Sequence, residues 1–248
     1  MPPVELRKLV GLTDADAFDN PDRSLVFPWI PKPNYETVFD FGCGCGRLAR
    51  QLLQQRSRPK RYVGVDINRE MVGWCQKNLS PVDQNFRFQH HDVRSASMAP
   101  DNSDRLTAPF EVEDSAFTLA LAVSVFTHLR EDQALHYLRE IARILRSDGL
   151  FVSTWFLFDK RDFPMMQPFQ NALFINEKDP TNAIILDRGW LDRALEECGL
   201  YVVRVDPPEI RGFHWWLTMR PRRSGDGPLE LPPDTAPRGS MPSPLVRR

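Results

Sequence analysis

The sequence predicts an α/β fold in which a seven-stranded, mostly parallel sheet is covered by helices on both faces. Three observations predict it. Between residues 36 and 220, short apolar runs alternate with segments whose apolar residues recur at helical spacing. One run, AFTLALAV at residues 116–123, is apolar throughout, as in a central parallel strand covered on both sides. The last two runs are separated by one short loop, which predicts an antiparallel C-terminal hairpin at the edge of the sheet.

The individual elements follow from this periodicity and from residues that begin or end helices. Asn68 and Asp187 can cap helices at their first turn, and Pro81 and Gly199 follow helix ends. Strands are expected at residues 37–41, 62–65, 85–90, 116–123, 150–158, 201–205 and 213–219, and helices at residues 46–56, 68–79, 131–145 and 187–198.

Three segments lie outside this alternation. Residues 1–35 contain several prolines and are expected to wrap around the domain of residues 36–220, with a short helix near residues 4–10. Residues 159–186 are rich in Phe, Met and Asn and fit no period, so we expect a lid over a bound acceptor. Residues 221–248 contain seven prolines and three glycines in 28 positions, which predicts a disordered tail.

The overall composition argues against several classes of partner. The 248 residues carry a formal net charge of -1, from 32 basic and 33 acidic side chains, so nothing in the balance favours nucleic acid or an anionic membrane. No apolar run is long enough for a membrane span. The N-terminal residues have scattered charges and no apolar signal-peptide core. We therefore expect a cytoplasmic protein without a nucleic-acid or membrane partner.

The stretch FDFGCGCGR, directly after the first predicted strand, raises a question of chemistry. Alternating glycines and cysteines suit a metal clip, a redox pair or a loop that approaches a small molecule. The four cysteines of the chain are too few for a disulfide framework. Cys43 and Cys45 are closer together than the usual zinc-ligand pairs, and no second pair is present, so no metal site is expected. Gly42, Gly44 and Gly46 instead allow the backbone to approach a ligand.

Acidic residues at two strand ends support the ligand interpretation. In an open parallel sheet, ligands bind beyond the carboxyl ends of the strands. Asp66 ends the second predicted strand, where a carboxylate can accept both hydroxyls of a ribose. Asp92 and Val93 follow the third strand, where they can frame an adenine ring. Alternative interpretations are a helix cap for Asp66 and an ordinary strand-end acid for Asp92.

The spacing of the loop distinguishes two classes of nucleotide cofactor. A dinucleotide loop has glycine at the sixth position of G-x-G-x-x-G, where this chain has Arg47. The loop also follows Asp40, whose charge would repel a pyrophosphate but attract the ammonium of an amino acid. Both differences favour a nucleoside that carries an amino acid.

Five motifs, in order, resemble those of class I S-adenosylmethionine (SAM)-dependent methyltransferases: VFDFGCGCGR, YVGVDIN, FQHHDV, LALAVSVFTHL and LREIARILRSDGLFVSTWF. The resemblance covers residues 36–158, extends to the C-terminal hairpin, and within the family is similar to bacterial small-molecule methyltransferases. It departs at residues 146–149, where a Pro-Gly-Gly turn is commoner. It implies a Rossmann-like fold, SAM as cofactor and methyl transfer as the reaction.

The resemblance also implies roles for individual residues. The glycine loop would line the methionine part of the cofactor, with the small cysteines tolerated beside it, and an acid before the loop would hold the ammonium. Residues after the second and third strands would bind the ribose and adenine, and residues after the fourth would close the pocket. The implied cofactor-binding residues are Asp40, Gly42, Cys43, Gly44, Gly46, Asp66, Ile67, Asp92, Val93, Ala122, Val123 and Ser124.

The acceptor is not specified by these motifs. We expect O-methylation of a small molecule or glycan unit, because the Asn/Asp-Pro-Pro-Tyr/Phe box of many nucleic-acid N-methyltransferases is absent after the fourth strand. N-methylation of a small amine, a non-catalytic SAM-binding module and a nicotinamide dehydrogenase remain alternatives. His128 is the best-placed candidate for a general base, although we favour a structural role for it, capping the following helix or supporting the cofactor. His90, His91 and His214 are weaker candidates.

Overall fold

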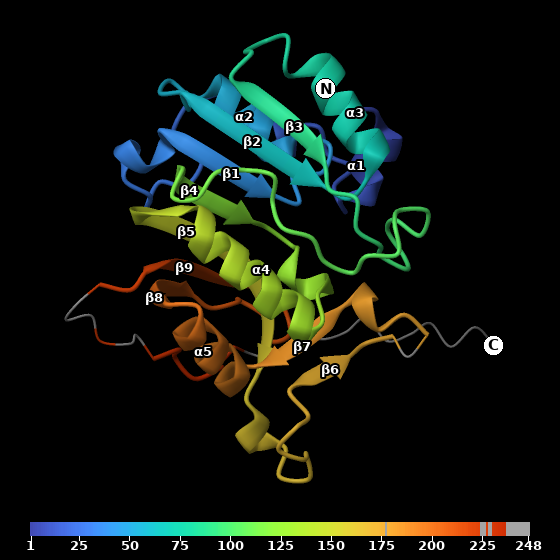
Figure 1. The fold of residues 1–248 in the computed structure, drawn as a ribbon, viewed down its shortest axis with the longest axis vertical. Coiled ribbons are helices and arrows are strands. Elements are labelled where there is room, and N and C mark those ends of the chain that lie inside the picture. Colours follow the sequence, from blue (N-terminus) through green and yellow to red (C-terminus); the bar gives the residue numbers. More distant parts are fainter. Residues whose placement is uncertain (177, 224–226, 228–229, 237–248) are drawn as a thin grey trace.

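The computed structural model describes residues 1–176, 178–223, 227 and 230–236. Within these residues, one nine-stranded sheet crosses the molecule (Figure 1). Its strands are β1 (Thr37–Phe41), β2 (Arg61–Asp66), β3 (Phe86–His90), β4 (Phe117–Ala122), β5 (Leu145–Phe158), β6 (Ala172–Phe174), β7 (Ile184–Asp187), β8 (Leu200–Asp206) and β9 (Trp215–Pro221).

The predicted mostly parallel sheet and its antiparallel C-terminal hairpin are confirmed. Strands β3, β2, β1, β4 and β5 lie side by side and pair in parallel. Strand β9 pairs with β5 antiparallel, and β8 pairs with β9 antiparallel, which is the expected C-terminal hairpin. Because β1 to β5 are parallel, their carboxyl ends meet at one edge, which is where a ligand is expected.

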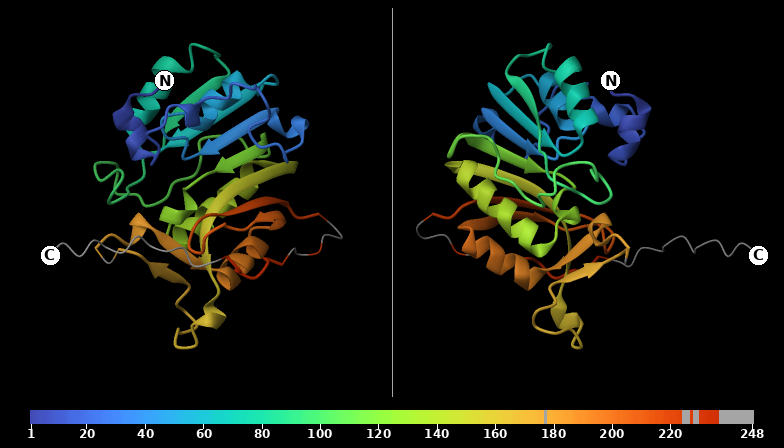
Figure 2. Two further views of the ribbon diagram at one scale, coloured as in Figure 1. Left: turned by 180° about the vertical axis from the view of Figure 1, so that it is seen from behind. Right: turned by 45° about the vertical axis from the view of Figure 1, so that its right-hand side comes forward.

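Helices cover both faces of this sheet. The apolar sides of α2 (Arg47–Gln54) and α3 (Arg69–Asn78) pack on one face, and those of α4 (Glu131–Ile144) and α5 (Arg188–Glu197) pack on the other. Seen from behind, α2 and the N-terminal residues lie in front of the strands, whereas α4 lies behind them (Figure 2). No helix among the described residues is both long and apolar enough to cross a membrane.

The segment of residues 159–186 contains regular structure that its sequence does not reveal. It holds the 3-10 turns η4 (Lys160–Asp162) and η5 (Pro180–Asn182), the short strand β6 and most of β7. Strand β5 begins at Leu145, rather than at residue 150, and continues past its contacts with β4 and β9. Its last residues, Phe156–Phe158, pair in parallel with β7, and β6 pairs antiparallel with β7. The insertion is therefore a small extension of the main sheet (Figure 1).

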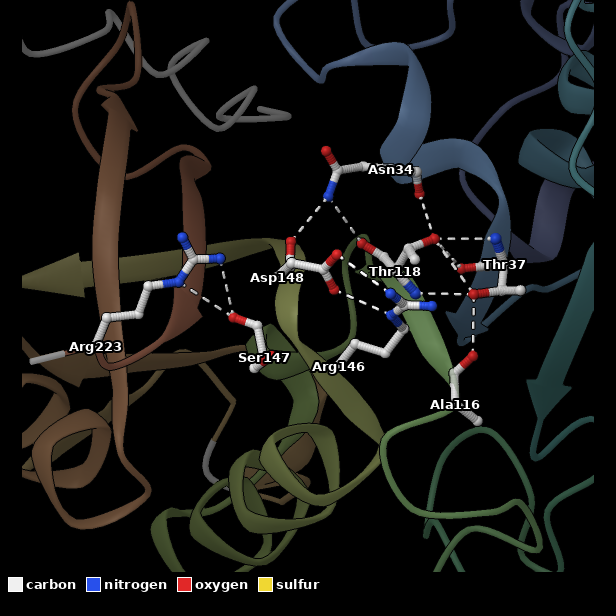
Figure 3. A network of polar contacts seen from close by, with 8 residues as sticks. All are labelled: Asn34, Thr37, Ala116, Thr118, Arg146, Ser147, Asp148 and Arg223. Atoms are coloured by element: carbon white, nitrogen blue, oxygen red, sulfur yellow. Dashed lines mark hydrogen bonds and ion pairs between the residues drawn. The ribbon is translucent and has the colours of Figure 1, made fainter.

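A polar network fastens the N-terminal segment to the amino end of the sheet (Figure 3). The Asn34 side chain donates to the carbonyl oxygens of Thr118 and Asp148, each at 3.2 Å. The Thr37 hydroxyl donates to the carbonyl of Ala116 at 3.0 Å, and the Thr37 amide donates to the Thr118 hydroxyl at 2.9 Å. These bonds tie the turn before β1 to β4 and β5, so the segment is held at the edge opposite the expected ligand.

The described part of the C-terminal segment differs from the expected disordered tail. Pro221 belongs to β9, and Leu231 is only 9% exposed. Most of residues 230–236 are exposed, but the segment is held at Leu231 and Pro232, whose carbonyl oxygens accept hydrogen bonds from Arg188, which is 8% exposed. A buried guanidinium requires acceptors, and this segment supplies them. Residues 224–226, 228–229 and 237–248 lie outside the described residues.

Candidate cofactor site

The glycine loop joins β1 to α2 at the carboxyl edge of the sheet. Gly42, Gly44 and Gly46 have φ angles of 77°, 54° and 80°, a region that residues with a side chain rarely adopt. The start of the loop is hydrogen-bonded to β2, because the amides of Gly42 and Cys43 donate to the carbonyl of Val65 at 2.8 and 3.1 Å. Glycine is needed for packing as well: a Cβ on Gly42 would lie 2.3 Å from Val125.

Asp66 connects this loop to the end of β2. One carboxylate oxygen accepts the amide N–H of Gly44 at 2.7 Å, and the other accepts that of Asn68 at 2.8 Å. The Asn68 side chain in turn accepts the amide of Met71 and caps α3. Removal from water raises the pKa of Asp66 above its ordinary value, against the opposing effect of the two N–H donors. The half-buried carboxylate is thus held at the edge where a ribose is expected.

If Asp66 binds the ribose, as we propose, Asp66→Asn weakens S-adenosylhomocysteine about tenfold, or about 1.4 kcal/mol. The reason is that asparagine keeps one acceptor oxygen but loses the charge, and charged hydrogen bonds contribute more than neutral ones. Calorimetry measures the affinity, and Asp104→Asn, a change at a side chain that is 96% exposed, is the control. Unchanged affinity in a folded Asp66→Asn variant would contradict the ribose assignment.

The residues expected to flank the adenine are joined by a side chain that sequence reasoning missed. Asn102 donates from its amide nitrogen to the carbonyl oxygens of Ile67 and Val93, both at 2.9 Å. Val93 is buried and Asp92 is exposed, with one carboxylate oxygen accepting the amide of Ser103 at 3.2 Å. The polar stretch after β3 therefore holds together the two segments expected to flank the adenine. Its polar composition was the only feature of the sequence that pointed to this role.

Asp40 lies beneath the loop rather than at its surface. Its side chain is 1% exposed, and one carboxylate oxygen accepts the Tyr62 hydroxyl at 2.6 Å. Burial raises the pKa of Asp40 to about 6, with the Tyr62 hydrogen bond acting in the opposite direction. The role expected for Asp40, holding a cofactor ammonium directly or through water, stays a prediction, and this buried carboxylate is not exposed for a direct contact.

The loop cysteines also point inward. Cys43, Cys45 and Cys75 are free thiols, each at most 6% exposed, and a Cβ on Gly64 would lie 2.9 Å from Cys43. Burial raises the pKa of Cys45 to about 11, so the thiol, rather than the metal-binding thiolate, is its neutral-pH form. The cysteines are small core residues under the loop, and Cys43 can contact a ligand only through its backbone.

The segment after β4 forms the other wall of the edge. Ala122 is fully buried, Val123 is half-buried, and Ser124 is exposed with a left-handed φ of 58°. Next, η3 (Phe126–His128) presents His128, whose Nδ1 lies 3.0 Å from the carbonyl oxygen of Thr181 in the insertion. The structure therefore brings the predicted base candidate to this edge and joins it to the insertion.

The paired histidines at the end of β3 take different positions. His91 is 8% exposed, its Nε2 lies 2.8 Å from the Tyr137 hydroxyl, and burial lowers its pKa to about 4. It faces the core beneath α4. His90 Nε2 lies 3.0 Å from the carbonyl oxygen of Ile67, so this ring supports the predicted adenine segment.

Comparison with protein families gives one match to this part of the chain. A family model described as a methyltransferase domain matches residues 38–149. These residues begin within β1, include β2 to β4, the glycine loop and Asp66, and end within β5.

Individual relatives are distant. A small RNA 2'-O-methyltransferase of Arabidopsis thaliana is 26% identical over 125 residues, which are 50% of this chain and only 12% of that protein. A SAM-dependent methyltransferase from Methanosarcina mazei superposes with a TM-score of 0.51 at 17% identity, covering 76% of this chain and 93% of that one. A geranyl diphosphate C-methyltransferase from Streptomyces coelicolor A3(2) gives 0.53 at 13% identity, with 75% and 73% covered. The two solved structures share the fold.

Proposed function

We propose that the chain, whose residues 38–149 match a methyltransferase domain, is a class I SAM-dependent methyltransferase that transfers a methyl group to a hydroxyl oxygen of a small molecule or glycan unit. When bound, SAM supplies a methyl group on a positively charged sulfur, which is already activated for transfer. The protein must then align the acceptor, exclude water and receive the acceptor's proton.

The residues at the carboxyl edge of the sheet fit this cofactor. Each oxygen of Asp66 accepts one backbone N–H, and a carboxylate oxygen has a second lone pair, so each can also accept a ribose hydroxyl. We assign the glycine loop to the methionine part and the chain around Ile67 and Val93 to the adenine. The residues after β4, Ala122 to Ser124, would then lie beside the transferred methyl group.

One contact supports placing the acceptor next to the insertion. The 3.0 Å approach of His128 Nδ1 to the Thr181 carbonyl holds η5 against the segment that follows β4. An acceptor reaching the methyl group would thus pass beside the insertion, which we propose as its lid. Among the described residues of the insertion, five large apolar side chains are exposed and available to such an acceptor: Phe163, Met165, Phe169, Phe174 and Ile175.

A ribose hydroxyl of RNA is a second candidate acceptor, favoured by the match to the plant small RNA 2'-O-methyltransferase. That match covers half of this chain and a small fraction of the plant protein. The formal net charge of -1 gives no general attraction to a polyanion. We therefore place RNA second, and we design the assay to distinguish the two.

The test is methyl transfer from SAM with a carbon-13 methyl group to separated metabolite, glycan and RNA fractions of a cell extract. We expect label in the metabolite or glycan fraction, with the carbon-13 chemical shift of a methoxy group. Label confined to RNA would show that the acceptor is RNA rather than a small molecule or glycan. A carbon-13 shift typical of an N-methyl group would show that the acceptor atom is nitrogen rather than oxygen. Binding of S-adenosylhomocysteine without transfer to any fraction would indicate a non-catalytic module.

A further inference from the structure

Three elements bring polar groups together beyond the carboxyl end of β4 and beside the later residues of β5. His214 lies directly before β9, and its Nε2 is 3.3 Å from the hydroxyl oxygen of Ser124. Ser124 is oriented by its own backbone, since its amide donates to the Thr154 hydroxyl on β5 at 2.7 Å. This bond accompanies the left-handed φ of 58° at Ser124. A positive φ at a residue other than glycine costs free energy, and such strain is concentrated at functional sites.

The imidazole of His214 is held in one orientation by packing. Its ring stacks on Phe156 of β5, with centroids 4.7 Å apart and planes inclined by 19°. Partial burial lowers the pKa of His214 below its ordinary value, and the nearby charge of His128 lowers it further. His128 is the titratable residue whose positive charge, when present, lowers the pKa of the His214 imidazole. The imidazole is consequently neutral at neutral pH, which is the form that accepts a proton.

We propose that His214, held against Ser124, takes the proton of the acceptor hydroxyl during methyl transfer. The proposal rests on the O-methylation proposed above. In the tautomer with its proton on Nδ1, His214 presents the Nε2 lone pair on the side of Ser124. In that tautomer the Ser124 hydroxyl donates to Nε2, so an acceptor hydroxyl reaches this lone pair by taking the place of the Ser124 hydrogen bond. The segment after β4 is where the methyl group is expected.

The step is balanced. The acceptor O–H proton passes to Nε2, the acceptor oxygen forms its bond to the methyl carbon, and the electrons of the broken sulfur–carbon bond remain on sulfur. The products are the methyl ether, S-adenosylhomocysteine and an imidazolium that releases its proton to water. Such a base is needed for alcohols and for phenols that are protonated at neutral pH.

His128 has a different task in this arrangement. Its Nδ1 faces the Thr181 carbonyl, which can only accept, so this nitrogen carries a proton and links η3 to the insertion. A positive charge on His128 would disfavour a second positive charge on His214. His128 is thus a positioning residue, and its effect on the pKa of His214 is smaller than that of burial.

The first test needs no acceptor. Histidine carbon-13 NMR titration, in the presence of S-adenosylhomocysteine, follows the five imidazoles of the chain, assigned through single His→Gln variants. We expect His214 to titrate below about 6.5, the ordinary histidine value. In His128→Ala its pKa should rise towards that value, whereas His136→Gln, a change on α4, should leave it unaltered. A His214 that titrates above the ordinary value would be charged at neutral pH, and the proposal would fail.

The second test measures transfer to the fraction labelled in the extract assay. We expect His214→Ala to lower kcat by about 10² to 10⁴, with S-adenosylhomocysteine affinity nearly unchanged and the ascending limb of the pH–rate profile lost. His128→Ala should keep that limb and move its midpoint to higher pH. The opposite assignment, with the limb lost only in His128→Ala, would overturn the proposal. If no fraction is labelled, the proposed function fails, and the titration alone decides whether His214 is available as a base.

Discussion

Gly42→Ala is expected to lower the free energy of unfolding by about 2–5 kcal/mol. One part of the loss is the left-handed conformation, with φ of 77°, which costs a residue with a Cβ about 1–2 kcal/mol. The other part is overpacking, because the new Cβ would lie 2.3 Å from Cγ2 of Val125, and inserted atoms in a packed region cost about 1–3 kcal/mol. Urea denaturation monitored by circular dichroism measures the change.

Two matched variants separate these contributions. Gly42→Ala combined with Val125→Ala removes the close contact but keeps the unfavourable φ, so it should recover about half of the loss. Gly73→Ala changes a glycine in α3 that has nothing within 4 Å of the added Cβ, and it should be neutral or stabilising by up to about 1 kcal/mol. Gly42→Ala that unfolds like the wild type would mean that the loop does not have this conformation in solution.

Asp40→Asn should stabilise the protein above pH 7 and have little effect near pH 4. The folded-state pKa of Asp40 is about 6, against an ordinary value of 3.8. Between these values the folded protein binds more protons than the unfolded chain, so stability falls as the pH rises through this window. The penalty is complete above pH 7 and amounts to about 3 kcal/mol, since each pKa unit corresponds to about 1.4 kcal/mol.

Urea denaturation at pH 4 and pH 8 measures the difference between wild type and Asp40→Asn. Tyr62→Phe is the matched variant: it removes the hydroxyl that donates to the ionised carboxylate, so it should destabilise the protein more at pH 8 than at pH 4. An Asp40→Asn effect of equal size at both pH values would show that this carboxyl is not the titrating group. Calorimetry on Asp40→Asn tests whether Asp40 contributes to binding S-adenosylhomocysteine. The buried position of Asp40 under the loop argues against a direct contact.

The fold was predictable because most of its elements are encoded locally. The alternation of apolar runs and amphipathic segments predicted β1 to β5, α2 to α5 and the terminal hairpin of β8 and β9. The exceptions are informative. Strands β6 and β7 have three and four residues, too short for a recognisable period, and β7 forms because β5 continues beyond its other neighbours. Residues 230–236 are fixed by Arg188, a partner far away in the sequence.

In the candidate site, too, some features were predictable from the sequence and others depend on tertiary packing. The sequence by itself determined the glycine loop and the position of Asp66, because a turn that needs positive φ demands glycine and a strand end has a fixed place on the sheet edge. The direction of the Asp40 and Cys43 side chains was decided by tertiary packing, which places both in the core. Asn102 and the insertion also acquire their neighbours only in the folded chain.

The same reason explains the pair of Ser124 and His214, which are 90 positions apart in the chain. Local propensity and periodicity describe each residue's immediate neighbours, so they place Ser124 after one strand and His214 before another. Which side chains then meet depends on the pairing of β9 with β5 and on the stacking of His214 against Phe156. The sequence predicted the cofactor class and determined the scaffold, whereas the tertiary structure decided which polar groups meet beside β5, because those contacts exist only once distant strands pack side by side.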